Sequence, residues 1–85
     1  MPPVSTAAQI VEILDEALTL NGRAASFTAG TRLLGALPEL DSMAVVTIIA
    51  ALEDRFGFTV NDDEIDGSVF ETFGSLQAFV DGKLG

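Results

Sequence analysis

Residues 40–43, with the sequence Leu-Asp-Ser-Met, contain the side chain of this chain that is best placed to do chemistry. Ser42 lies between a stretch without helical periodicity and the most apolar run of the sequence, so the pattern predicts that a helix begins here. A helix N-terminus offers unpaired N–H groups and the positive end of the helix dipole, and both stabilise phosphate oxygens. A phosphodiester that a transferase joined to the Ser42 hydroxyl would therefore suit this place.

Asp41 and Ser42 also have a purely structural explanation. Asp and Ser are favoured at the residue that caps a helix, and most Asp-Ser pairs before helices do nothing else. On this alternative the chain is an acidic helical adaptor that binds other proteins, and Ser42 acts only as a helix cap.

The composition argues against an independent enzyme. The chain has no Cys and no His, so it lacks a thiolate, a base that titrates near neutral pH and a soft metal ligand. A serine nucleophile needs a neighbouring base, which a partner enzyme would have to supply. Residues 62–67 match the start of a calcium-binding loop, but its twelfth position, where a Glu should bind the ion, is Phe73. We therefore expect neither catalysis nor a metal site.

The charge and the length restrict the class of partner and the location. Thirteen acidic residues against four basic ones give a formal net charge of −9, which repels nucleic acid and favours partners with basic surfaces. The most apolar stretch, 43–52, is about half as long as a membrane-spanning helix needs to be. The length leads us to expect a single domain over residues 1–85, as a monomer that does not insert into a membrane. We expect a cytoplasmic location, because Cys and a signal-peptide pattern are both missing.

The spacing of apolar residues predicts an all-α fold with three main helices and one short one. A first helix covers about residues 6–20 and a second about 43–56, each followed by residues suited to a left-handed helix end, Asn21-Gly22 and Gly57. Between these helices, residues 23–40 form a long loop without clean periodicity. Its apolar anchors are Phe27, Leu33, Leu34 and Leu37.

Two further helices are expected in the C-terminal third of the chain. Ser68 and Glu71 have the spacing of a capping box, which predicts a short helical turn around residues 69–70. A last helix follows Gly74 or Ser75, where apolar residues again recur at helical spacing.

The second helix carries two apolar stripes, and only one of them can easily face the core. The first stripe consists of Val45, Ile48, Ile49, Leu52 and Phe56. The second consists of Met43, Val46, Thr47 and Ala50. Either the helix is buried nearly all round, or the second stripe is exposed beside Ser42. We favour exposure and a role in docking partner enzymes, with Glu53 and Asp54 meeting basic groups at its far end.

The motif at residues 40–43 resembles the Leu-Asp/Gly-Ser-Leu/Met attachment motif of acyl and peptidyl carrier proteins. Residues 51–56, Ala-Leu-Glu-Asp-Arg-Phe, resemble the Ala-Leu-Glu-Glu-x-Phe pattern of that family, and residues 60–64 resemble its acidic turn. Residues 73–80 are similar to the start of its final helix. The resemblance covers most of the chain from about Thr28. The overall pattern also resembles discrete bacterial carriers encoded with exosortase and exopolysaccharide systems.

This resemblance implies a right-handed four-helix bundle with a long first loop and a short third helix. It implies that Ser42, within a motif that includes Asp41, carries a 4′-phosphopantetheine arm from coenzyme A that holds acyl groups as thioesters. The implied partners are a phosphopantetheinyl transferase and acyl ligase, synthase and acyltransferase enzymes with basic docking surfaces. The family pattern has an acid where Thr47 stands and a Pro where Asn61 stands. The Thr at position 47, in place of an acid, argues against docking to ordinary fatty-acid synthase partners.

The family fold also implies a hydrophobic pocket that shelters the acyl chain. Its expected lining is Ile49, Val60, Leu76 and Phe79.

Overall fold

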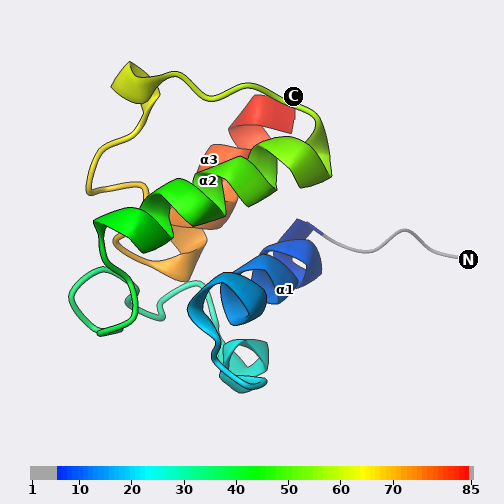
Figure 1. Cartoon of the computed structure of the whole chain (residues 1–85). Coiled ribbons are helices and arrows are strands. Elements are labelled where there is room, and N and C mark those ends of the chain that lie inside the picture. Colours follow the sequence, from blue (N-terminus) through cyan, green and yellow to red (C-terminus); the bar gives the residue numbers. More distant parts are fainter. Residues whose placement is uncertain (1–5, 85) are drawn as a thin grey trace, which may run out of the picture.

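Three α-helices form the frame of the molecule, which the computed structural model describes over residues 6–84 apart from the side chain of residue 62. The elements are α1 (Thr6–Leu18), η1 (Arg23–Ser26), α2 (Ser42–Phe56), η2 (Asp62–Glu64) and α3 (Phe73–Leu84), where η marks a 3₁₀ helix. α1 lies alongside α2, and α3 lies on the far side of α2 in the view of Figure 1. The predicted all-α class is confirmed: residues 6–84 form no strand, only an isolated bridge between Arg32 and Thr72. None of the described helices is long and apolar enough to cross a membrane.

The helices bury one continuous set of apolar side chains. The largest fully buried members are Ile10, Leu14, Leu20, Leu33, Ile48, Leu52, Leu76 and Val80, drawn from all three α-helices and from the segment between α1 and α2. Burying a side chain of this size stabilises the fold by about 1.5–3 kcal/mol before entropy is counted. No polar or charged side chain is buried among the described residues, so apolar burial dominates the stability of this core. The single domain over residues 1–85 stays a prediction.

α1 ends earlier than the sequence suggested. Its last helical residue is Leu18, because Thr19 already adopts a positive φ of 53° and leaves the helical path. Asn21 and Gly22 follow with positive φ, as expected of this pair. The Asp15 carboxylate accepts the Gly22 N–H at 2.8 and 3.0 Å, and this contact directs the chain into η1.

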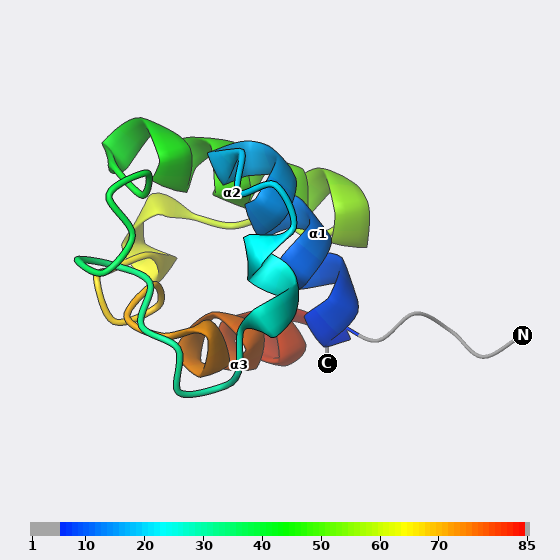
Figure 2. The same ribbon diagram turned by 90° about the horizontal axis from the view of Figure 1, so that it is seen from below.

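The long loop before α2 is fastened to the start of α3. Backbone hydrogen bonds join Leu33 N–H to the Glu71 carbonyl at 3.0 Å, and Leu34 N–H to the Phe70 carbonyl at 2.9 Å. Figure 2 shows the loop passing α3 on its way from η1 to α2. Leu33 is fully buried as predicted, but its neighbour Leu34 is 41% exposed, so the prediction of Leu34 as an anchor is wrong. Adjacent residues of an extended backbone point to opposite sides, and only one of the two can reach the core.

Two further hydrogen bonds fasten the same loop to the first residues of α3. Phe73 N–H donates to the Thr31 carbonyl at 2.8 Å and Gly74 N–H to the Ala29 carbonyl at 2.9 Å. A Cβ at position 74 would lie 2.8 Å from the Ala29 carbonyl oxygen, so this close approach requires glycine. The loop is therefore an integral part of the fold although it contains little regular structure.

The short third helix expected around residues 69–70 is a turn, so the prediction of four helices is corrected to three. Ser68 does not cap a helix, because its hydroxyl and its N–H both donate to the Asp66 carboxylate. These two bonds hold the pKa of Asp66 below its usual value, and the bond from the Ser68 hydroxyl contributes most. The Phe70 and Glu71 carbonyls, which a helix would use internally, accept from the first loop instead.

α3 begins at Phe73, slightly before the predicted Gly74 or Ser75. A reciprocal pair of bonds closes its first turn: Ser75 N–H donates to the Thr72 hydroxyl at 3.0 Å, and Thr72 N–H to the Ser75 hydroxyl at 3.1 Å. This arrangement has the logic of a capping box, with a Ser in the place of the usual Glu or Gln.

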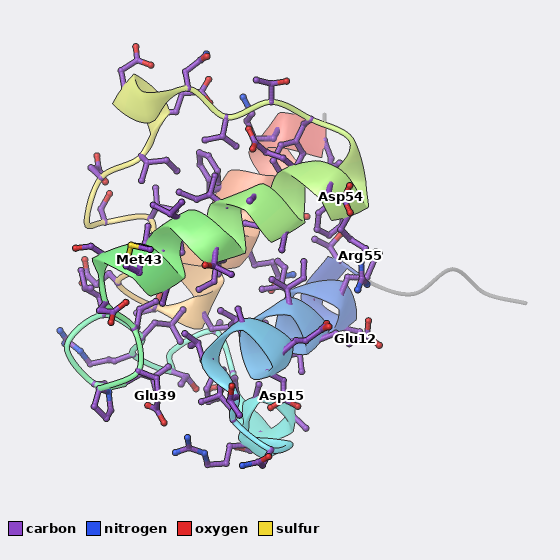
Figure 3. The ribbon with its side chains drawn as sticks, viewed as in Figure 1. Glu12, Asp15, Glu39, Met43, Asp54 and Arg55 are labelled. Atoms are coloured by element: carbon purple, nitrogen blue, oxygen red, sulfur yellow. The ribbon has the colours of Figure 1, made fainter. Side chains whose placement is uncertain are left out.

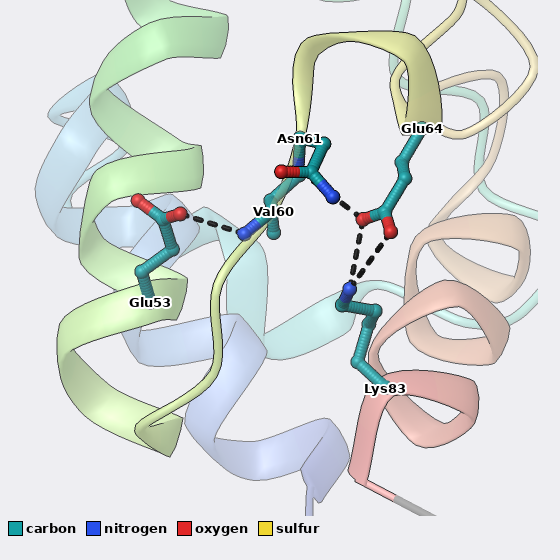
Figure 4. Close-up of polar contacts among 5 residues, drawn as sticks. All are labelled: Glu53, Val60, Asn61, Glu64 and Lys83. Carbon is teal, nitrogen blue, oxygen red and sulfur yellow. Dashed lines mark hydrogen bonds and ion pairs between the residues drawn. The ribbon is translucent and has the colours of Figure 1, made fainter.

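The segment after α2 is held at both ends by acidic side chains. α2 ends at Phe56, and the next residue, Gly57, has a φ of 74° that suits a left-handed helix end. The Glu53 carboxylate then accepts the Val60 N–H at 2.7 Å, and Glu64 pairs with Lys83 of α3 at 2.8 Å (Figure 4). The hydrogen bond from Lys83 is the main reason that the pKa of Glu64 lies below its ordinary value.

Replacing Glu64 by Gln should reduce the acid sensitivity of the fold. The pKa of this carboxyl is lower in the folded protein than its ordinary 4.5, so its stabilising contribution is complete at neutral pH. The contribution disappears as pH falls through the lower folded pKa. The difference in unfolding free energy between wild type and Glu64→Gln should therefore shrink as pH drops from about 5 to 3.

Urea unfolding followed by circular dichroism over this pH range measures the effect. Asp63→Asn is the matched control, because Asp63 is exposed and has no ion-pair partner among the described residues. If the difference in unfolding free energy between wild type and Glu64→Gln stayed constant with pH, the stabilising role of the Glu64 carboxylate would be contradicted.

Candidate functional site

The N-terminus of α2 is capped by Asp41, not by Ser42. The Asp41 carboxylate accepts the Ala44 N–H at 2.8 Å, and the Asp41 backbone is extended, as a capping residue requires. Ser42 is the first helical residue and is exposed. Its hydroxyl has no hydrogen-bond partner among residues 6–84. This hydroxyl is therefore free to react from the N-terminal end of α2.

The first turn of α2 leaves backbone donors open beside this hydroxyl. The first hydrogen bond from an α2 N–H to a backbone carbonyl joins Val45 N–H to the Asp41 carbonyl at 2.9 Å. The N–H groups of Ser42 and Met43 find no acceptor within the described part of the chain. Open donors at a helix N-terminus, together with the helix dipole, are the groups that hold a phosphate. The site fits a phosphodiester on the Ser42 oxygen.

The chain that enters α2 is held from the inside and from the outside. Leu40 is only 6% exposed and anchors the segment in the core. On the outer side, Glu39 pairs with Arg23 of η1, whose Nε also donates to the Leu20 carbonyl. The hydrogen bond from Arg23 lowers the pKa of Glu39. This ion pair could not be predicted, because nothing in the sequence links two charges sixteen residues apart.

The second stripe of α2 is exposed, so burial of the helix nearly all round is wrong. Met43 is 74% exposed and Val46 is 62% exposed, whereas Ile48 and Leu52 are buried. Thr47, Ala50 and Asp54 are also exposed. Figure 3 shows Met43 at the start of α2 and Asp54 near its end. The exposed residues Met43, Val46, Thr47, Ala50 and Asp54 are called the outer face of α2 below. The docking role of this face stays a prediction.

Glu53 lies apart from this face. It is half-buried, and one of its carboxylate oxygens accepts the Val60 N–H. A partner that docked on Glu53 would therefore meet a carboxylate that already makes an internal contact with the segment after α2. The sequence signals the charge of Glu53 but not this acceptor role.

The residues expected to line an acyl pocket lie at or near the core. Leu76 is fully buried, and Ile49, Val60 and Phe79 are half-buried. A surface hollow of about 370 Å³ lies elsewhere, between α1 and α2, and is lined by Ile13, Thr47 and Asp54 among others. The acyl pocket stays a prediction.

Comparisons with known proteins agree with this geometry. A family model described as the phosphopantetheine attachment site matches residues 8–81. The fold is similar to the solution NMR structure of a holo acyl carrier protein from Nitrosomonas europaea, with a TM-score of 0.87 and 49% sequence identity. That match covers 95% of this chain and 98% of the other. A comparison with curated proteins found no match.

Proposed function

The chain belongs to the family of phosphopantetheine attachment domains, and on that premise we propose that Ser42 is the residue that carries the arm. The protein is an acyl carrier, which holds acyl intermediates and presents them to enzymes. It has a covalent 4′-phosphopantetheine as its cofactor, and the family consists of carriers, not catalysts. The thiol at the end of the arm holds an acyl group as a thioester.

The observation that carries the assignment of Ser42 is its unengaged hydroxyl. The adaptor alternative requires Ser42 to be a helix cap, but Asp41 performs that role. With its side chain exposed and without a hydrogen-bond partner in the described chain, Ser42 has no structural task that explains its presence. No observation favours the adaptor function.

The site supplies a nucleophile and a binding place for phosphate, but no base. One oxygen of the nearest carboxylate along the chain, that of Asp41, accepts the Ala44 N–H, and a carboxylate is in any case a weak base for a serine hydroxyl. In the transfer the Ser42 oxygen attacks the phosphorus that bears the pantetheine of coenzyme A, the phosphoanhydride bond breaks, and adenosine 3′,5′-bisphosphate leaves. The Ser42 proton passes to a base of the transferase, and the open N–H groups of the first turn stabilise the phosphodiester that results. Interaction with a phosphopantetheinyl transferase and with acyl-handling enzymes follows from the family.

The outer face of α2 is the docking surface that lies next to Ser42. Its first three turns present Met43, Val46, Thr47 and Ala50 without a charge, and Asp54 adds an acid at the far end. An apolar contact near the reacting serine with a charged rim would position a partner enzyme. The monomeric state and the cytoplasmic location stay predictions.

Incubation with coenzyme A and a broad-specificity phosphopantetheinyl transferase tests the function. Intact-protein mass spectrometry should show one added arm and no second addition. An unmodified mass with several different transferases would contradict the assignment. Tryptic mapping of the product should place the arm on the peptide that contains Ser42.

A further inference from the structure

The hollow between α1 and α2 has a chemistry that the attachment site does not use. Its floor is apolar and consists of Ile13, which is buried, and of Ala17 and Ala51, which are half-buried. Its walls carry the charged side chains of Glu16, Asp54 and Arg55. This hollow, called the α1–α2 groove below, thus has an apolar base and a charged rim.

The charges on the rim are not balanced. Arg55 pairs with Glu12 at 3.0 Å across the two helices (Figure 3), and the Asp15 carboxylate is occupied by the Gly22 N–H. Glu16 and Asp54 have no ion-pair or hydrogen-bond partner among the described side chains. A second hollow, lined by Glu12, Asp15 and Glu16, adjoins the groove on the α1 side. A net negative charge therefore remains over the groove, with its two unpaired carboxylates on opposite helices.

We infer that the α1–α2 groove receives a lysine or arginine side chain of a partner enzyme, an inference that rests on the proposed carrier function. The aliphatic stem of such a side chain would cover Ile13, Ala17 and Ala51, as long cationic side chains do on apolar surfaces. Its charged end would lie between Glu16 and Asp54. Both the apolar floor and the negative rim are matched by this one kind of side chain.

Other occupants match only part of the groove. A neutral apolar segment would remove two carboxylates from water without compensation, which costs free energy. A metal ion is not favoured, because no group of three or more potential ligands gathers in the described part of the chain. An anionic ligand would be repelled by the rim.

The groove is continuous with the outer face of α2. Thr47 and Asp54 belong to both surfaces. One partner protein could thus contact Met43 and Val46 near the attachment serine and place a side chain in the groove at the same time. The docking surface then extends from α2 onto α1, and the cation fixes the rotation of the partner about the helix axis.

Kinetics of arm attachment test the inference with charge-neutral variants. The double variant Glu16→Gln with Asp54→Asn removes the two unpaired carboxylates of the groove. Glu71→Gln with Asp81→Asn is the matched control, since it removes the same two charge types from exposed positions outside the groove. The KM for the carrier protein with a phosphopantetheinyl transferase should rise at least about fivefold in the groove variant and less than about twofold in the control. Equal KM values for the two double variants would overturn the inference, because a general loss of negative charge would then explain the effect.

A small probe reports on the groove without any enzyme. Addition of n-butylguanidinium, which copies the end of an arginine, should produce saturable NMR shifts at Ala17, Thr47 and Ala51. These shifts should be absent in the groove variant and present in the control. A wild-type protein that accepts no arm but shows the shifts would disprove the proposed function and leave the groove chemistry standing. Absence of saturable shifts in wild type would overturn the groove as a cation site.

Discussion

Ser42→Ala should abolish attachment of the arm while the protein stays folded. The variant lacks the oxygen that must form the phosphodiester, so the expected loss is complete. Its effect on stability should be within about 0.5 kcal/mol, because the residue is exposed and the Asp41 cap is untouched. Intact-protein mass after incubation with coenzyme A and a transferase measures the first effect, and thermal unfolding measures the second.

Ser26→Ala is the control for a general effect of removing a hydroxyl. Ser26 is also exposed, but its hydroxyl donates to the Arg23 carbonyl within η1. This variant should gain the arm like wild type. If Ser42→Ala still gained an arm, the attachment site would have to be sought at another serine or threonine.

Val46→Glu should leave the fold nearly unchanged and Ile48→Glu should largely unfold it, although the two residues are two positions apart in one helix. Val46 is 62% exposed, so a carboxylate there should change the unfolding free energy by no more than about 0.5 kcal/mol. Ile48 is fully buried, and an unpaired carboxylate in the core should cost more than about 3 kcal/mol and largely unfold the protein. Urea unfolding of both variants measures these differences.

The folded Val46→Glu variant then tests the outer face of α2 for docking. A charge at this position would lose its water when a partner covers it, so arm attachment and acyl loading should be slower than in wild type. Val46→Thr keeps the size and shape of the side chain without a charge and should retain more activity. If Val46→Glu reacted at the wild-type rate, the partner would have to dock elsewhere.

The prediction of α2 from the sequence was accurate because a single local rule governs it. Helical spacing places Ile48 and Leu52 on one side and Met43 and Val46 on the other, and the structure buries and exposes them accordingly. The helix end at Gly57 follows from its freedom to adopt a positive φ. Both features depend on residues within a few positions of each other.

Features that depend on distant contacts could not be predicted in this way. The pattern of Ser68 and Glu71 suggested a helix, but the first loop takes up the carbonyls of that turn. Glu53 looked like a surface charge, yet it accepts the Val60 N–H. The α1–α2 groove requires knowing which faces of two helices meet. The local sequence names the donors and acceptors, whereas the tertiary fold decides how they pair.

The hydrogen bonds between the first loop and the start of α3 are long-range contacts. They join residues that are roughly forty positions apart in the chain, so closing them costs more chain entropy than forming a bond within a helix. The same bonds should be among the first to open in local unfolding, since the loop has little regular structure of its own. The loop leads directly into Asp41, so opening of these bonds would loosen the segment that precedes Ser42.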